Sequence, residues 1–484
     1  MLKIFAPLSL LSLAAAMTFS VFSCCLLGLY LATGVGLHLP FKELIAAACT
    51  IAVLAFVMKT LPTVGTQLGK FADARHALWY AILLGLALRL MIWIVTLPEV
   101  QINDGWHYLE LAKRLYLHQP YELDGYAFWP PGTPLVYAAF MHLLGQPAWI
   151  AVVVNCSFFL LSAISVRAIC QSLGFAPRDA ALAVAVMACW PELFFPVSQV
   201  SKEILLIGML PAVLALLLSQ RTWPALLAGG VAGLAIMTQP SLTLLPLFLA
   251  AALLAARITP RTVLARMALL CIGAMLAIAP WTYRNYQVFG EFVPISTNAG
   301  LVLHAGNQPA MVNAMGEVGG FLTPPAPPVP LKNDLLLSRW HKAEAIRFIL
   351  DNKADFVRLV WQRMVITMGD DSDSAYRSLR LTDKVSDKVY LLSKALSNAC
   401  WMAIAAALAV SCWLVRKRHA GQELAPVVVL AASATLYLIA VHGMAEGGGR
   451  HHMAWSWIYA LILVAALGRV PRHKTAAARE TVPA

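Results

Sequence analysis

The sequence predicts an all-α, polytopic integral membrane protein. Hydrophobic residues make up 60% of the 484-residue chain and charged residues only 12%. The mean hydropathy is +0.72, well outside the usual range of soluble domains. Apolar stretches of roughly 17 to 25 residues, enough to cross about 30 Å of hydrocarbon, recur along nearly the whole chain. We therefore expect about twelve transmembrane helices.

These helices are expected in order along the chain, starting from a cytoplasmic N-terminus. The first apolar run has the length of an uncleaved span and lacks a clear small-residue cleavage site, which favours a span over a signal peptide. Residues 133–144 are apolar but too short to cross, which predicts an interfacial or re-entrant helix. The spans are expected near residues 8–34, 42–58, 77–98, 148–166, 180–197, 203–219, 223–238, 241–256, 264–282, 392–414, 424–442 and 453–469.

The orientation follows from the positions of Lys and Arg, which concentrate in cytoplasmic loops. The net charge of +12 is therefore topological and gives no reason to expect nucleic acid as a partner. The alternation of spans places these basic residues in the cytoplasm: Lys59, Lys70, Arg75, Arg167, Arg178, Arg221, Arg257, Arg261, Arg266, Arg416, Lys417, Arg418, Arg469, Arg472 and Lys474.

The same alternation assigns four segments to the opposite, extracytoplasmic side: residues 98–131, 198–203, 283–390 and 442–452. The longest of them contains a Pro-rich stretch at 323–330, which lacks the backbone donors for helix or sheet and predicts an extended linker. After it, apolar residues at helical spacing between charges over 338–368 predict an amphipathic helix pair lying on the membrane.

Neither the cysteines nor the outer histidines predict a metal centre. The nine cysteines lie in or beside apolar segments without a C-x-x-C pair, as expected of small buried hydrophobes. The run Asp370-Asp371-Ser372-Asp373 has a D-x-D pattern, but a solvated loop or helix cap is the ordinary interpretation. Adjacent histidines such as His451 and His452 cannot both face one ion from a regular helix. No metal site is predicted, and a divalent ion stays a minor alternative.

The most informative polar segment is 102–108, with the sequence I-N-D-G-W-H-Y, directly after an apolar stretch. It places Asp104 among His107 and Tyr108 at a membrane boundary, ahead of the aromatic run 128–132. A carboxylate in this setting is a candidate catalytic group, and the neighbouring His107 and Tyr108 are candidates for substrate binding. Capping of the predicted helix 105–117 by Asp104 is the structural alternative.

Several motifs, taken in order, resemble the bacterial family 39 glycosyltransferases. This family belongs to the GT-C class and includes the protein O-mannosyltransferases and the aminoarabinose transferases of lipid A. The resemblance covers about residues 77–470. It rests on Asp104 in the first outer loop, W-P-P-G-T-P-L at 129–135, S-K-E-I-L at 201–205, T-Q-P at 238–240, A-P-W-T-Y-R-N-Y-Q-V-F-G-E-F-V-P-I-S-T-N-A-G-L at 279–301 and A-G-N-Q-P at 305–309.

The resemblance implies a GT-C fold in the bacterial inner membrane, with the active site facing the periplasm. It also implies transfer of a sugar from a polyprenyl phosphate to a lipid, glycan or protein acceptor, without a cofactor. On this basis the chain divides into two extra N-terminal transmembrane helices (1–76), a catalytic core (77–282) with the first outer loop at 99–131, an extracytoplasmic region (283–390), C-terminal transmembrane helices (391–470) and a cytoplasmic tail (471–484).

By the resemblance, Asp104 matches the acidic residue that acts as general base toward the acceptor hydroxyl or otherwise orients it. Glu203 matches a second acidic position and is a candidate for catalysis or donor binding. A hydroxyl must lose its proton as it attacks the anomeric carbon, and a carboxylate within hydrogen-bond reach accepts it. Lys202 is a candidate for donor binding, although a simple ion pair with Glu203 competes with that role.

The departing lipid phosphate requires cations at the outer face of the membrane. Arg284, with Asn285 beside it, and Arg450 are the candidates, and an interfacial anchor is the alternative role for Arg284. Arg450 lies in the turn G-G-G-R-H-H, where the family usually shows R-Y-R. Gln239 stands where many relatives carry Arg, so one head-group contact is missing or supplied elsewhere.

Two other functions remain open. A polymerase or ligase of surface polysaccharide would use diphosphate-linked glycans and would not be expected to carry the P-W-x-x-R-N stretch. A lipid or glycan transporter would need mid-membrane charges and repeated halves, and the sequence shows neither.

Overall fold

The computed structural model describes residues 2–33, 42–72, 76–313, 322–417 and 423–467, and within these it contains helices and turns but no strand. This confirms the predicted all-α architecture. Seven helices are long and apolar enough to cross a membrane by themselves, which confirms a multi-pass membrane protein. They are α1 (Leu2–Thr33), α2 (Lys42–Ala72), α3 (Ala77–Val95), α6 (Ile150–Ser172), α12 (Pro260–Phe289), α18 (Asp387–Lys417) and α19 (Ala425–Met444).

The expected number of twelve spans is not confirmed, because the other predicted spans fold as short or broken helices. The described residues give seven spans, or eight if α7 (Pro177–Cys189) is joined to the segment Pro191–Ser198 across a bend of 75°. Pro191 begins the short helix α8 (Pro191–Phe194), which leads into η1 (Phe195–Ser198). The remaining expected spans are α9 (Lys202–Leu217), α10 (Pro224–Thr238), η2 (Pro240–Leu244) with α11 (Leu245–Ala255), and α20 (Ser456–Leu467).

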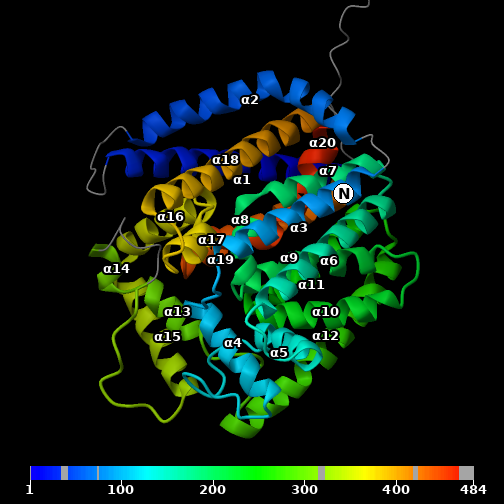
Figure 1. Cartoon of the computed structure of the whole chain (residues 1–484). Helices are drawn as coiled ribbons and strands as arrows, with labels where there is room; N and C mark the ends of the chain where they lie inside the picture. The colour runs from blue at the N-terminus through cyan, green and yellow to red at the C-terminus, as the bar shows by residue number, and fades with distance from the viewer. Residues whose placement is uncertain (1, 34–41, 73–75, 314–321, 418–422, 468–484) are drawn as a thin grey trace, which may run out of the picture.

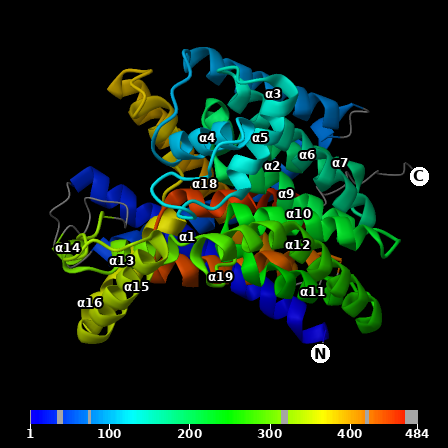
Figure 2. The ribbon, with the colours of Figure 1, turned by 90° about the horizontal axis from the view of Figure 1, so that it is seen from below.

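The helices form one bundle with two lateral groups (Figure 1). Helices α1, α2 and α18 pack against one another along one side. Figure 2 shows α10, α11 and α12 on the opposite flank from α13 (Ala299–Gly306), α15 (Asp334–Asp351) and α16 (Lys353–Gly369). Helices α10 and α12 cross closely because Gly229 faces Gly273: a Cβ at either position would lie 2.2 Å from a backbone carbonyl oxygen of the other helix.

The outer segments predicted from sequence are helical. The first outer loop contains α4 (Asn103–Tyr116), and the short apolar stretch after it is α5 (Gly132–Leu144). The predicted helix pair within 338–368 is confirmed as α15 and α16, and residues 322–330 before it form no helix or strand. Also present are α14 (Pro309–Asn313), α17 (Asp373–Ala375), the π-helical turn η3 (Tyr376–Arg380) and η4 (Gly449–Trp455). The predicted tail 471–484 lies outside the described residues, as do the predicted cytoplasmic residues Arg75, Arg418, Arg469, Arg472 and Lys474.

The centre of the acidic run after α16, Asp371 with Ser372, is buried, so the interpretation of the run as a solvated loop was wrong. Asp371 is fully buried and its Oδ1 lies 2.8 Å from Nε2 of His452. Its Oδ2 accepts a hydrogen bond of 2.7 Å from the Trp190 indole, and its backbone N–H donates to Asn398 Oδ1 at 2.7 Å. Burial raises the pKa of Asp371, and the hydrogen bond from His452 opposes this rise. This cluster fixes the loop that leads into η3.

Candidate functional site

Three segments far apart in the sequence bring Asp104 and two arginines together. Asp104 lies in the first turn of α4, where the helix dipole favours a carboxylate. Its Oδ2 accepts a hydrogen bond of 2.9 Å from Nη1 of Arg450 in η4 and lies 3.9 Å from Nη1 of Arg377 in η3. The N-cap residue of α4 is Ile102, and no side chain caps this helix end. The alternative that Asp104 caps the helix is therefore not observed, and its carboxylate pairs with the two arginines instead.

Arg450 is the centre of the cluster because it pairs with three carboxylates. Besides Asp104, its Nε lies 3.7 Å from Glu203 Oε1 and its Nη2 lies 3.5 Å from Glu446 Oε1. Burial alone would lower the pKa of Arg450, but Asp104, Glu203 and Glu446 outweigh it and raise that pKa. The guanidinium therefore stays charged and holds the carboxylates at fixed positions.

The electrostatics keep Asp104 ionised. Burial alone would raise its pKa, but Arg450, Arg377 and Lys202, in decreasing order, hold the pKa of this carboxyl well below its usual range. Tyr108, one turn further along α4, is buried beside it, and this burial raises the pKa of the phenol well above its ordinary value. Asp104 is therefore a hydrogen-bond acceptor and Tyr108 a neutral hydroxyl.

Arg377 is a site residue that sequence reasoning missed. Its Nε donates to Asp373 Oδ2 at 2.7 Å, which aims the guanidinium toward Asp104. It lies in the π-helical turn η3, which follows the buried loop around Asp371. Short π-helical turns often occur at functional sites, but the sequence R-S-L-R carries no pattern that distinguishes such a turn from an ordinary helix.

A small cavity of about 30 Å³ lies beside this cluster, lined by Asp104, Tyr108, Lys202, Glu203, Arg377 and Arg450 among others. Lys202 makes no hydrogen bond or ion pair with any residue that the structure describes. The alternative of a Lys202–Glu203 ion pair is thus not observed. Glu203 instead pairs with Arg450, and its Oε2 accepts a hydrogen bond of 3.0 Å from Ser201. Among the described residues that line this cavity, which we call the Asp104 pocket, Lys202 is thus a cation available to bind an anion.

The other predicted residues on α4 divide between the pocket and the surface. Tyr108 lines the Asp104 pocket, whereas His107 faces the outer loop. The His107 ring stacks on Trp129 at 4.6 Å between centroids, and its Nε2 lies 3.2 Å from Asp124 Oδ2. Trp129 also contacts Tyr108, so this indole joins the wall of the pocket to the outer surface.

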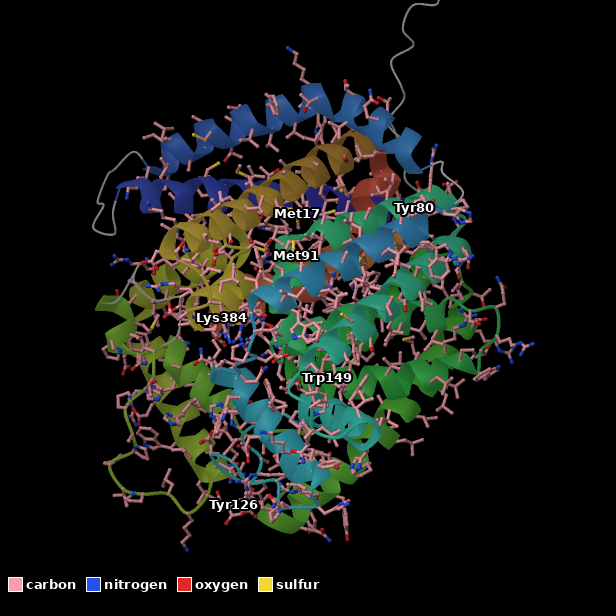
Figure 3. The ribbon with its side chains drawn as sticks, viewed as in Figure 1. Met17, Tyr80, Met91, Tyr126, Trp149 and Lys384 are labelled. Carbon is pink, nitrogen blue, oxygen red and sulfur yellow. The ribbon has the colours of Figure 1, made fainter. Side chains whose placement is uncertain are left out.

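Arg284 and Asn285 are not brought to the Asp104 pocket. Arg284 donates hydrogen bonds to the carbonyl oxygens of Tyr126 and Tyr121, and Asn285 is buried and donates to Val293 and Ile295. Tyr126, a partner of Arg284, lies at the end of the molecule farthest from α2 (Figure 3). Lys384 lies nearer the middle, where it donates a hydrogen bond to the Pro98 carbonyl oxygen before α4. These contacts fit the anchoring alternative for Arg284, and its predicted role in binding phosphate stays a prediction.

Among the described residues no group of three or more His, Cys, Asp or Glu side chains is placed to hold a metal ion. Two outer histidines, His304 and His341, lie with their Nδ1 atoms 2.8 Å apart. They form a buried hydrogen bond between α13 and α15.

No known family model matches the chain, and no curated protein matches it. Among solved structures it is similar to ArnT from Cupriavidus metallidurans bound to undecaprenyl phosphate, with 15% identity, a TM-score of 0.37, and coverage of 82% of this chain and 79% of that one. It is also similar to an Archaeoglobus fulgidus oligosaccharyltransferase tethered to an acceptor peptide, with 13% identity and a TM-score of 0.44. That match covers 82% of this chain, which spans half of that protein's length.

Proposed function

We propose that this protein is a GT-C-class membrane glycosyltransferase that transfers a sugar from a polyprenyl-phosphate donor to an acceptor hydroxyl outside the cytoplasm. One observation carries the proposal: the Asp104 carboxylate, 2.9 Å from Arg450, shares a pocket with Lys202, whose ammonium forms no ion pair with the residues that the structure describes. The motifs from 129–135 to 305–309 that resemble the family 39 enzymes support it, as does the multi-pass membrane architecture.

The proposed reaction uses both signs of charge in the pocket. Asp104 accepts the proton of the acceptor hydroxyl as its oxygen bonds to the anomeric carbon. The bond between that carbon and the phosphate oxygen breaks, and its electron pair leaves with the phosphate. Lys202 and Arg450 stabilise the negative charge on the phosphate, an interaction that is strong in a site with little water. Glu203 and Glu446 then keep the Arg450 side chain in position.

The proposed orientation follows the positive-inside pattern, which puts α4, η4 and the 283–390 segment on the extracytoplasmic side. The resemblance suggests the inner membrane of a bacterium. The acceptor is a lipid, a glycan or a protein that carries a hydroxyl within reach of Asp104.

The test is transfer of radiolabelled sugar from a panel of polyprenyl-monophosphate donors in membranes that contain equal amounts of each variant. We expect transfer by the wild type and by Glu110→Gln, a matched control because Glu110 lies on the same helix and pairs with Arg114 at 3.7 Å. Asp104→Asn should be slower by about 10²-fold or more. Equal rates for Asp104→Asn and wild type would reject the base. Transfer from diphosphate-linked glycans alone would instead indicate a polymerase or ligase.

A binding experiment provides a second test of the proposed function. Lys202→Met should weaken binding of sugar-free polyprenyl phosphate by about tenfold, since one charge-assisted contact to the phosphate is lost. Unchanged binding would remove Lys202 from the phosphate site.

A further inference from the structure

A second cavity adjoins the Asp104 pocket and shares Glu203 with it. It lies among α9, η2, α19 and η4. The side chains in its lining that can form hydrogen bonds are Glu203, Gln239, Ser241, Tyr437, His442, His451 and Trp455. Leu206, Leu242 and Leu438 supply apolar walls. We call it the His451 pocket. Because Glu203 lines both cavities, a ligand that reaches this carboxylate from the His451 pocket lies next to the Arg450–Asp104 pair.

Two buried polar atoms in the lining have no hydrogen-bond partner within the described part of the chain. Glu203 and His451 are each only 7% exposed. Oε1 of Glu203 has its ion pair with Arg450 at 3.7 Å but no hydrogen bond, and Nε2 of His451 has no hydrogen bond. Leaving such an atom unpaired in the interior is unfavourable, so a ligand that bonds to both atoms gains binding free energy from them.

Both histidines are held in place, and His451 is uncharged. The His442 and His451 rings stack with centroids 3.5 Å apart and an interplanar angle of 17°. Nδ1 of His442 bonds to the Glu446 carbonyl, which fixes that ring beneath His451. Burial, and then the neighbouring His442, hold the pKa of His451 well below its ordinary value, so its ring is a neutral partner for hydrogen bonds.

The lining disfavours an anionic ligand. The described residues that line it include no Lys or Arg, and the one charged group among them is the Glu203 carboxylate. A sugar carboxylate in this cavity would lie beside Glu203, whose counter-ion Arg450 is already shared with Asp104 and Glu446, so like-charge repulsion opposes its binding. A carboxylate, an imidazole, an amide and a hydroxyl beside apolar walls instead match a ligand that carries several hydroxyl groups on an apolar frame.

We propose that the His451 pocket binds the hydroxyl edge of the donor's sugar and selects sugars without a carboxylate. This inference rests on the proposed function. The cavity of about 40 Å³ has room for about three water-sized groups. That is enough for neighbouring hydroxyls on one edge, with the ring at the open mouth. Glu203 and His451 then bond to the sugar, while the phosphate binds at Lys202 and Arg450 in the Asp104 pocket.

The first test compares donors with a neutral hexose and with the corresponding uronic acid on the same polyprenyl phosphate. Wild type should prefer the neutral sugar by about 10²-fold in kcat/KM, and Glu203→Gln should reduce that preference at least tenfold because it removes the repelling charge. Glu446→Gln is the matched control: this carboxylate also pairs with Arg450 but is not part of the His451 pocket lining. It should change rates without changing the preference.

If Glu203→Gln transfers no sugar, measurements of donor affinity still test the inference. Wild type should bind the sugar-bearing donor more tightly than sugar-free polyprenyl phosphate, and His451→Phe should reduce that difference while leaving the affinity for the sugar-free lipid unchanged. Equal weakening of both ligands by His451→Phe would assign the pocket to the isoprenoid tail and overturn the inference. The same preference in wild type and Glu203→Gln would also overturn it. If wild type neither transfers any sugar nor binds polyprenyl phosphate, the proposed function itself fails.

Discussion

Nη1 of Arg450 lies 2.9 Å from Oδ2 of Asp104, across a separation of 346 residues in the sequence. The same guanidinium also pairs with Glu203 and Glu446, so one cation balances three carboxylates. In the proposed reaction, a donor phosphate competes with Asp104 for this cation. As Arg450 turns toward the phosphate, the pKa of Asp104 rises toward its ordinary value. The base therefore becomes stronger when the donor is bound, which favours a reaction in which the donor binds first.

Replacing Arg450 should change both the rate and its pH dependence. Arg450→Gln removes the cation at the leaving phosphate and should lower transfer by about 10²- to 10³-fold. It also removes the largest opposing charge that holds the pKa of Asp104 down, so this pKa rises. Since Asp104 must be ionised to accept a proton, the acid limb of the pH–rate profile should move to higher pH. The measurement is kcat/KM for the donor between pH 4 and pH 8.

Arg450→Lys separates charge from geometry in that experiment. A lysine keeps the positive charge but not the planar group that reaches Asp104, Glu203 and Glu446 together. We expect it to keep the wild-type acid limb better than Arg450→Gln does, while still losing rate. An acid limb that stays in the same place in both variants would show that Arg450 does not set the pKa of Asp104.

Arg377 should make a smaller contribution, because its Nη1 lies 3.9 Å from Asp104 and its nearer partner is Asp373 at 2.7 Å. Arg377→Gln should lower transfer about tenfold, the loss of a partly screened charge pair. Arg380→Gln is the matched control in the same π-helical turn, where Arg380 pairs with the exposed Asp387 at 3.1 Å. Equal losses in the two variants would mean that the turn is disturbed as a whole and that Arg377 has no special role.

The fold class followed from the sequence because the length and composition of the apolar stretches report burial in lipid directly. The number of spans did not, because hydropathy cannot distinguish a crossing helix from a short or bent one such as α9 or the pair α7 and α8. The break at Pro191 is visible in the sequence, but its angle depends on packing against other helices. The helix pair α15 and α16 was predictable because its periodicity is local.

The candidate site was predictable where a short polar segment interrupts apolar stretches, as around Asp104, Glu203 and Arg450. It was not predictable where charges are common. Arg377 and Asp371 lie in a polar stretch, and only the tertiary structure shows that one faces Asp104 and the other is buried against His452. The motif containing Arg284 was recognisable, but the hydrogen bonds of that arginine to the carbonyl oxygens of the 121–126 loop were not.

The buried pair Asp371 and His452 should be required for stability. Asp371→Ala leaves the Trp190 indole N–H and Nε2 of His452 without a partner in the interior, and should lower the free energy of unfolding by about 3 to 5 kcal/mol. Asp370→Ala is the control, because Asp370 is half-buried and accepts a hydrogen bond from Ser372. It should cost about 1 kcal/mol. Unfolding by denaturant in detergent measures both variants, and equal values would contradict the assigned role of the cluster.

The contact between α13 and α15 should weaken in acid, because His341 Nδ1 lies 2.8 Å from His304 Nδ1 in a buried hydrogen bond. Burial, and then His304, lower the pKa of His341 from 6.5 to about 4. Between these two values the unfolded chain binds a proton that the folded chain does not, so stability falls as the pH drops from 6.5 toward 4.

Hydrogen exchange corrected for intrinsic rates should therefore show less protection in α13 and α15 at pH 5 than at pH 7. His341→Gln should lose most of this pH dependence, whereas His118→Gln, at an exposed position after α4, should keep it. Protection in wild type that is the same at both pH values would show that the pair does not titrate in this range.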